Sequence, residues 1–322
     1  MTMTTTPVKK SFSWTTTILL VVFVGLPVLA CACSAIAGVA MLRGDSLSLA
    51  GATGDAVAVV FAEGTITSGS AASISATGVT PRRIRSDLKR AAADPSVKAV
   101  VVRVNSPGGS VVASNEIHKL LNDCGKPVVF SFGETAASGG YYIACAGQWI
   151  VANPDTLTGS IGVISEIPNT DRLLDKLGVE FIVIKSGANK DIGSPFRAMT
   201  DEEKRLFQTI IDQAYDGFVK IVAEGRRLPE DKVRQIADGR VYTGRQALEL
   251  GLVDQLGYLD DAVSKAGELG GIQGKPRVVE YIPRLSWAEI LVASLTRAPA
   301  LSLEQLVGLG ATPQLEYRLV IP

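Results

Sequence analysis

Apolar and polar positions alternate in blocks along the first half of the main domain. Short apolar runs rich in β-branched residues indicate buried strands over residues 56–62, 98–104, 128–132 and 149–152. The stretches between them have the apolar spacing of helices, over residues 82–93, 111–121 and 141–146. This strand–helix alternation predicts an α/β fold built from βα repeats, with a mostly parallel sheet and crossover helices.

Two later segments carry patterns of their own. Residues 201–224 place an apolar stripe on one helical face, formed by Leu206, Ile210, Ile211, Tyr215, Phe218 and Ile221. The tail, residues 283–322, contains a helix-like apolar stretch over 285–295 and a possible extended edge segment over 315–322. Packing of this tail on its own domain is favoured over a membrane-surface or subunit contact.

The N-terminal pattern predicts one membrane anchor. Residues 17–42 are small or apolar throughout, which is longer than the roughly 20 residues that cross a bilayer. Lys9 and Lys10 precede this span, so the positive-inside rule places residues 1–16 in the cytoplasm and the main domain outside it. A linker follows over residues 43–54, and the main domain spans residues 55–282. A cleaved secretory signal and a lipidated Cys31 are the alternatives.

Ser138 is the most informative residue for chemistry. It lies between the predicted strand 128–132 and the predicted helix 141–146, where a serine can be an exposed nucleophile. Gly139 and Gly140 follow it and let the backbone approach a ligand closely. The unpaired N–H groups of the helix start could hold an oxyanion there.

A nucleophilic serine needs a base, and the chain contains one histidine, His118. His118 lies on the polar side of the predicted helix 111–121, and the pattern favours a surface residue. A lysine is therefore the better base, as in serine hydrolases of the Ser-Lys type.

Five motifs then carry a resemblance to a known family. They are Asn105-Ser-Pro-Gly-Gly109, Ala137-Ser-Gly-Gly-Tyr-Tyr142, Thr156-Leu-Thr-Gly-Ser-Ile-Gly-Val163, Lys185-Ser-Gly-Ala-Asn-Lys-Asp-Ile-Gly-Ser-Pro195 and Ala237-Asp-Gly-Arg-Val-Tyr-Thr-Gly-Arg245. In this order they resemble the signal peptide peptidase A family of Ser-Lys peptidases, in its short, single-repeat form. The likeness covers residues 55–282, and it implies the crotonase-like fold shared with the Clp protease subunits.

The resemblance also implies the roles of individual residues. Ser138 would be the nucleophile and Lys190 the general base, whereas Lys185 is more simply a charge at the end of an apolar run. Ser160 would orient the lysine, with an ordinary turn serine as the alternative. The backbone N–H groups of Gly109 and Gly139 would form the oxyanion hole, although a tight strand-to-helix turn alone also explains the glycines at 108 and 109.

The implied function is that of a membrane-anchored serine endopeptidase in the cell membrane, with its catalytic domain outside the cytoplasm. Its expected substrates are remnant signal peptides and other short hydrophobic or unfolded peptides. The family also implies a homo-oligomer whose active sites are shared between protomers. The alternatives are a crotonase-like acyl-CoA enzyme and a non-enzymatic membrane scaffold.

Other partner and cofactor classes find no support in the sequence. The 32 Lys and Arg residues balance 32 Asp and Glu residues, which gives no indication of nucleic-acid binding. We expect no cofactor and no metal, because the sequence has no His or Cys motif at ligand spacing. Cys124 and Cys145 could form a disulfide bridge outside the cytoplasm, but a buried thiol is favoured for Cys145.

Overall fold

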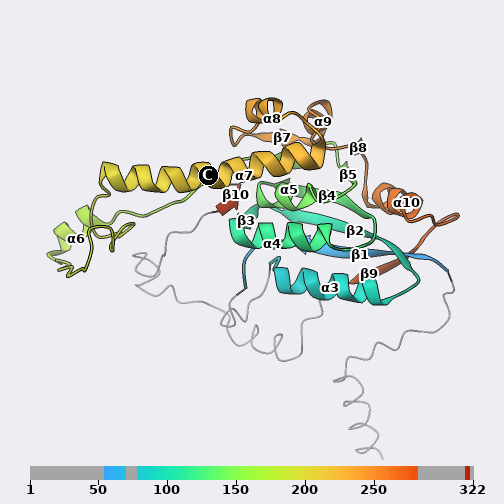
Figure 1. The fold of residues 1–322 in the computed structure, drawn as a ribbon, viewed down its shortest axis with the longest axis horizontal. Coiled ribbons are helices and arrows are strands. Elements are labelled where there is room, and N and C mark those ends of the chain that lie inside the picture. Colours follow the sequence, from blue (N-terminus) through green and yellow to red (C-terminus); the bar gives the residue numbers. More distant parts are fainter. Residues whose placement is uncertain (1–53, 70–77, 282–315, 320–322) are drawn as a thin grey trace, which may run out of the picture. The chain divides into compact units, whose positions relative to one another are not determined.

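The structure is a computed structural model that describes residues 54–69, 78–281 and 316–319 of the chain (Figure 1). The predicted anchor, residues 17–42, lies outside the described residues, as do residues 1–16 and most of the linker and tail. In the part of the chain that the structure describes, no helix is both long enough and apolar enough to span a bilayer.

The described residues form strands and helices that alternate along the chain. The strands are β1 (Ala56–Glu63), β2 (Val97–Ser106), β3 (Gly108–Ser110), β4 (Val128–Ala137), β5 (Trp149–Ala152), β6 (Leu157–Gly159), β7 (Val241–Thr243), β8 (Gln255–Leu256), β9 (Arg277–Tyr281) and β10 (Glu316–Arg318). The helices are α3 (Pro81–Ala93), α4 (Val111–Asn122), α5 (Gly139–Ala144), α6 (Asp171–Leu177), α7 (Asp201–Arg226), α8 (Glu230–Ile236), α9 (Gly244–Glu249) and α10 (Leu259–Leu269).

The main sheet has the order β7-β6-β4-β2-β1-β9, and β5 pairs with both β4 and β8. All of these pairings are parallel except the one between β6 and β7. The strands β3 and β10 form a separate antiparallel pair. The predicted α/β architecture is thus confirmed as a mixed, mainly parallel sheet with crossover helices.

The sheet is buried on both faces, which explains why its central strands are continuously apolar. Along β1, Ala56, Ala58 and Val60 belong to a large core that also contains residues of α3, α4, α5 and α7. Val57 and Val59 point to the opposite face and pack in a smaller core with residues of α10. Because parallel strands are covered by their own crossover helices, both side-chain directions have to be apolar.

Helix boundaries follow capping residues. Thr80 caps α3, with Pro81 in the first turn, and Ser110 caps α4 by accepting a hydrogen bond from the Ala113 amide. A capping box formed by Thr200 and Glu203 starts α7. The cap at Ser110 starts α4 directly after β3.

The helix α7 is 26 residues long, and its two halves have different surroundings. Its C-terminal half buries Phe218, Val219 and Val222 in the large core, whereas Leu206 and Ile210 in the N-terminal half are exposed. Residues 165–200 precede α7 and include α6. We call this segment the lysine arm because it contains Lys190. Figure 1 shows the arm at the end of α7 that lies away from α5.

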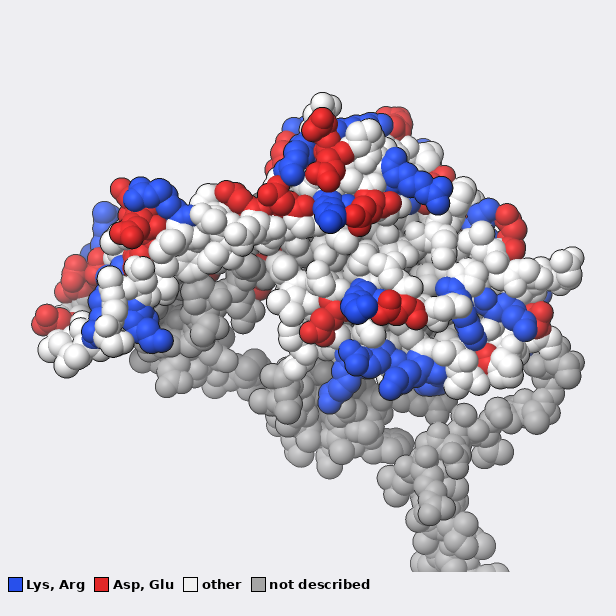
Figure 2. Space-filling view, viewed as in Figure 1, with Lys and Arg blue, Asp and Glu red and all other residues white. Residues whose placement is uncertain are grey.

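Charged side chains are mixed in sign over most of the face seen in Figure 2. The exception is α3, where basic side chains gather on the surface: Arg82, Arg83, Arg85, Lys89 and Arg90. The balanced charge of the whole sequence is therefore not distributed uniformly over the described residues.

Candidate active site

Ser138 occupies a strained turn between β4 and α5. The strand β4 extends to Ala137, five residues beyond the predicted strand end, and α5 begins at Gly139. Ser138 therefore makes the whole strand-to-helix turn, with a φ of 54° and a ψ of −117°. A positive φ at a residue other than glycine costs about 1–3 kcal/mol and persists only where its surroundings impose it. Here the Ser138 amide donates to Gly159 O at 2.8 Å, and its carbonyl accepts from the Tyr142 amide at 2.8 Å.

Within the described part of the chain, the side chain of Ser138 is buried and unpartnered rather than exposed as the sequence suggested. The residue is 1 % exposed, and its Oγ has no hydrogen-bond partner among the described residues. Buried hydroxyl groups are normally hydrogen-bonded, and the exceptions include catalytic groups. A sharp turn from strand to helix that presents an unpaired serine is the geometry of a nucleophile elbow.

Two glycine backbones approach this serine from the adjoining elements. A Cβ atom added to Gly139 would lie 3.2 Å from the Gly109 nitrogen, and one added to Gly108 would lie 2.6 Å from the Gly139 nitrogen. The sequence-predicted oxyanion residues Gly109 and Gly139 are thus brought together beside Ser138. Gly109 has a φ of 150°, and its missing side chain leaves room for Ile66 O, 2.1 Å from the added Cβ. The backbone conformation and the close approach of the Ile66 backbone both require glycine at this position.

Ser160 also lies next to Ser138. Pairing of β6 with β4 brings Ala137 opposite Gly159, and Gly159 accepts the Ser138 amide. Ser160 follows directly, is buried, and has a φ of 49°. The structure thus places Ser160 beside Ser138, while none of the side-chain hydrogen bonds of the described residues joins it to Lys190.

Lys190 lies away from Ser138 in the protomer. It is exposed, in a series of turns in the lysine arm, where its amide donates to Gly187 O at 3.2 Å. The arm contacts the start of α7 through Arg197 and Glu203. Phe218, which packs on Tyr142 of α5, lies fifteen residues further along the same helix, or about 22 Å at ~1.5 Å per residue. The structure therefore does not bring the predicted base to the predicted nucleophile within one chain (Figure 1).

His118 is half-buried rather than fully solvated. Its ring contacts the edge of Tyr142, with centroids 5.4 Å apart, and its Nδ1 lies 3.2 Å from the Asn122 amide nitrogen. Burial lowers the pKa of His118 below its usual value. Neither ring nitrogen bonds Ser138 among the described residues, so the histidine is not placed as a triad base.

The strand β10 lies beside the turn that contains Ser138. The sequence suggested this part of the tail only as an extended segment. Its Glu316 exchanges two hydrogen bonds with Ile164, both of 3.1 Å, and on its other side Tyr317 pairs with Gly109 of β3. A Cβ added to Gly108 would lie 1.9 Å from Tyr317 O. The carbonyl of Tyr317 and the Gly139 nitrogen thus both lie close to the position that a Cβ of Gly108 would occupy. The strand fills a groove between β3 and Ile164 at the predicted oxyanion hole.

An apolar pocket receives the Tyr317 side chain. Its ring stacks on Tyr142 with centroids 5.0 Å apart and contacts Phe218 at 4.6 Å. Its hydroxyl donates to Ala214 O at 3.0 Å, and burial raises its pKa well above the usual value. This side of the site can therefore enclose a large apolar side chain next to Ser138.

Buried polar contacts hold α5 in place. Arg226 forms a two-pronged ion pair with Asp254, at 2.9 and 2.6 Å, and Tyr141 donates to Leu252 O at 2.8 Å. Asp254 also accepts the Ile150 amide at 2.7 Å. Sequence reasoning did not find this pair, since Arg226 and Asp254 stand in no recognisable motif. Cys145, at the end of α5, is a buried free thiol, and Cys124 is also free.

Among the described residues, no group of three or more His, Cys, Asp or Glu side chains could hold a metal ion. A strained serine beside two backbone amides, on an α/β fold, is the arrangement of a serine hydrolase.

Comparisons with known proteins agree with this class. The model of peptidase family S49 matches residues 121–273, and the model of Clp protease matches residues 80–152. A provisionally named protease of Synechocystis sp. is 46% identical over 221 residues, which are 68% of this chain and 79% of that protein. The chain therefore belongs to peptidase family S49, has a Clp protease-like α/β fold, and is a serine peptidase.

Two further relatives are longer than the region they share with this chain. A provisionally named signal peptide peptidase of Enterococcus faecium is 47% identical over 179 residues, which are 55% of this chain and 52% of that protein. Protease 4 of Salmonella typhi is 42% identical over 248 residues, which are 74% of this chain and 40% of that protein. Resemblance to the signal peptide peptidase A family is thus confirmed.

Proposed function

We propose that the chain is a membrane-anchored endopeptidase with a Ser138–Lys190 dyad, which degrades remnant signal peptides and other short hydrophobic or unfolded peptides. The observation that carries this proposal is the strained Ser138, whose buried Oγ is unpartnered among the described residues and lies beside the amides of Gly109 and Gly139. The family match makes an acyl-CoA enzyme or an inactive scaffold the weaker alternatives.

The proposed mechanism follows from the charges that develop during peptide hydrolysis. Neutral Lys190 takes the proton from the Ser138 hydroxyl as its oxygen attacks the peptide carbonyl. The N–H groups of Gly109 and Gly139 stabilise the oxyanion, an interaction worth roughly 10²- to 10³-fold in rate per donor. The lysine then returns the proton to the leaving amine, and a water molecule hydrolyses the acyl-enzyme. Ser160, beside Ser138, is proposed to orient the lysine amine.

The separation of Lys190 from Ser138 favours a site shared between protomers. The lysine arm exposes large apolar side chains, at fractions that include 83% for Ile182 and 96% for Ile184. Exposed apolar patches of this kind mark interaction surfaces. We infer that the arm packs against a neighbouring copy of the chain in a homo-oligomer and supplies Lys190 to the neighbour's Ser138.

The groove beside Ser138 supports extended, apolar peptides as substrates. This part of the proposal is supported by β10, which pairs with β3 beside Ser138 and packs the Tyr317 ring against Tyr142 and Phe218. Strand pairing gives affinity through backbone groups, while the pocket selects the side chain. An anchor over residues 17–42 would hold this groove, on the extracytoplasmic side, next to the cell membrane from which hydrophobic peptides emerge.

A serine-reactive fluorophosphonate probe tests the proposal directly. We expect labelling of the wild type that disappears in Ser138→Ala, and loss of peptide cleavage in both Ser138→Ala and Lys190→Ala. His118→Ala is the control and should retain activity. Absence of labelling in the folded wild type, or full activity of Lys190→Ala, would refute the dyad.

Mixing variants tests the shared site. Oligomers that combine Ser138→Ala and Lys190→Ala subunits contain interfaces with one intact serine and one intact lysine. Recovered cleavage supports a site built across the interface. Full activity of a protein that elutes as a monomer in size-exclusion chromatography would show that one chain supplies both groups.

A further inference from the structure

Lys190 lies in a segment that its backbone alone holds weakly. Residues 185–192 form neither helix nor strand. Three main-chain hydrogen bonds shape the turn, from Lys190 to Gly187 O and from Ile192 to Asn189 O at 3.2 Å each, and from Ser194 to Asp191 O at 3.1 Å. A catalytic amine has to be placed within a fraction of an ångström, and a displacement of about 1 Å can cost on the order of 10²-fold in rate. Side-chain contacts must therefore supply the missing rigidity.

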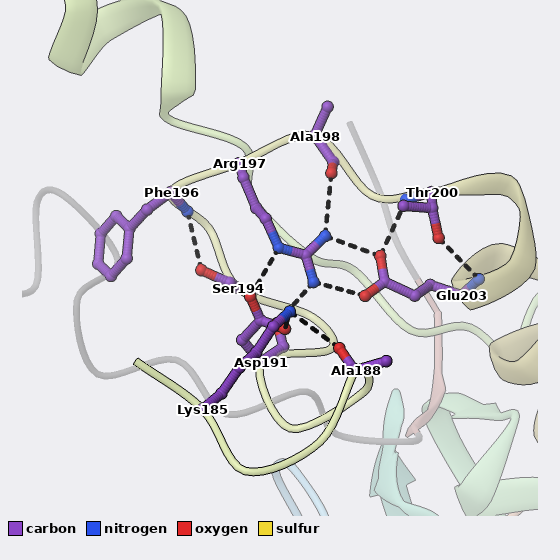
Figure 3. Close-up of polar contacts among 9 residues, drawn as sticks. All are labelled: Lys185, Ala188, Asp191, Ser194, Phe196, Arg197, Ala198, Thr200 and Glu203. Atoms are coloured by element: carbon purple, nitrogen blue, oxygen red, sulfur yellow. Dashed lines mark hydrogen bonds and ion pairs between the residues drawn. The ribbon is translucent and has the colours of Figure 1, made fainter. Parts of the chain in front are cut away.

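Arg197 supplies these contacts (Figure 3). Its Nε donates to Asp191 Oδ2 at 2.9 Å, and one terminal nitrogen donates to Asp191 O at 3.2 Å. The two terminal nitrogens donate to both carboxylate oxygens of Glu203, at 2.8 and 2.5 Å. One planar guanidinium thus joins the residue next to Lys190 to the first turn of α7, in the two-pronged geometry that only arginine provides.

Glu203 is a rigid anchor for this arginine. It is the third residue of α7, its side chain accepts the Thr200 amide at 2.9 Å, and its own amide donates to Thr200 Oγ1 at 3.2 Å. The residue is buried, and Arg197 and the Thr200 amide together lower its pKa to about 2. The start of α7 is consequently held by its own capping box as well as by Arg197.

Lys185 completes the contacts of Asp191. Its Nζ donates to Asp191 Oδ1 at 2.5 Å and to Ala188 O at 2.9 Å. Both carboxylate oxygens of Asp191 are therefore bonded to cations other than Lys190, and the two cations hold the pKa of Asp191 well below its usual range. An unpaired carboxylate next to Lys190 would instead favour the protonated amine, which cannot act as a base.

The remaining charges near the turn are nearly balanced. Asp201 pairs with Lys204 at 2.9 Å on α7. The helix α6, joined to the turn by the hydrogen bonds from Thr170 to Pro195 O, carries two acidic and two basic side chains, Asp171, Arg172, Asp175 and Lys176.

We propose that Arg197 is a positioning residue for the general base: it fixes the Lys190 turn to the start of α7 and, together with Lys185, keeps the Asp191 carboxylate away from the Lys190 amine. This inference rests on the proposed function, because it assumes that Lys190 is the base. It gives Lys185, which reads in the sequence as an ordinary strand-end charge, a role in the same turn.

The test is the pH dependence of kcat in the full-length protein. Under the proposed function, kcat rises with pH as the lysine loses its proton, and this rise is called the rising limb of the pH profile. A positive charge nearby disfavours the protonated amine, so removal of a cation from this turn should move the rising limb to higher pH. We expect Arg197→Gln to lower kcat by roughly 10- to 100-fold with little change in KM, and to move the limb upward by about one pH unit. Arg197→Lys should restore the position of the limb, since it keeps the charge, but not the full kcat.

Two further variants separate charge from folding. Asp191→Asn weakens the contacts with Arg197 and Lys185 but removes a negative charge instead of a positive one, so the rising limb should move to lower pH. Lys185→Gln removes an exposed cation and should move the limb upward even if Arg197→Gln fails to fold. Arg205→Gln, on the exposed side of α7, is the matched control and should leave kcat and the profile unchanged.

The inference is overturned if the rising limb stays at the wild-type pH in both Arg197→Gln and Lys185→Gln. It is also overturned if the limb of Asp191→Asn moves to higher pH. Failure of the proposed function looks different. Lys190→Ala would then keep wild-type activity, whatever the Arg197 variants show.

Discussion

Substitution of Tyr317 by alanine tests whether β10 competes with substrate for the groove beside Ser138. Tyr317 is 2 % exposed, its ring packs on Tyr142 and Phe218, and its backbone pairs with Gly109 at the predicted oxyanion hole. Under the proposed function, a peptide bound for hydrolysis would pair with the same backbone edge and place a side chain in the same pocket. The strand and the substrate would then exclude one another.

The size of the effect follows from what the side chain buries. Full burial of a side chain of this size contributes about 1.5–3 kcal/mol, and favourable aromatic pairs add about 0.5–1.5 kcal/mol. A loss of about 2–4 kcal/mol lowers the equilibrium constant for occupancy by the strand roughly 30- to 1,000-fold. We expect kcat/KM for an added apolar peptide to rise by about 10-fold or more, because the wild-type groove is closed by β10 in the structure.

The assay is cleavage of a short fluorogenic apolar peptide by the full-length protein, with thermal unfolding measured in parallel. Glu316→Gln, which changes a partly exposed residue on the same strand, is the control and should alter kcat/KM less than about 2-fold. A synthetic peptide of residues 312–322 should inhibit Tyr317→Ala. Unchanged or reduced kcat/KM in a folded Tyr317→Ala protein would show that Tyr317 only packs the core and that the strand does not compete.

Three other predictions concern the oxyanion hole, the start of α7 and the support of α5. Gly108→Ala should abolish cleavage and fluorophosphonate labelling in a folded protein, since the added Cβ would lie 2.6 Å from the Gly139 nitrogen at a φ of 98°; retained labelling would contradict this geometry. Glu203 has a lowered pKa of about 2, so its contribution to stability is present above its unfolded pKa of about 4.3 and is lost as the pH falls towards about 2. In this window the midpoint of thermal unfolding should fall further for the wild type than for Glu203→Gln, and parallel curves would count against the assignment. Arg226→Met leaves Asp254 as a partly buried, unpaired charge and should destabilise the protein by up to about 3 kcal/mol in chemical denaturation, whereas the double variant Arg226→Met/Asp254→Leu should recover much of this loss.

Local patterns were sufficient for the elements that surround Ser138. Continuous β-branched runs predicted β1, β2, β4 and β5, because a parallel sheet covered on both faces needs apolar side chains in both directions. The strand-to-helix position of Ser138 also followed from the sequence. The length of β4 did not, since its last residues, Gly133-Glu-Thr-Ala-Ala137, have no strand pattern and pair only because β2 and β6 lie alongside.

Contacts between distant segments could not be predicted in the same way, and they decide how the site works. The strands β6 and β7 have three residues each, too few for a periodic pattern. The strand β10 pairs with β3 across some two hundred positions, and nothing in Glu316-Tyr-Arg318 specifies that edge; the specificity lies in the pocket that Tyr142 and Phe218 form for Tyr317. Lys190 is a different case, because the motif points to the residue, while the fold joins its turn to Glu203, about 22 Å along α7 from Phe218 of the pocket. Under the proposed shared site, the distance between base and nucleophile is a property of the interface between two chains. If the proposal holds, the sequence motifs name both members of the dyad, but their reacting geometry forms only when a neighbouring protomer covers the apolar lysine arm.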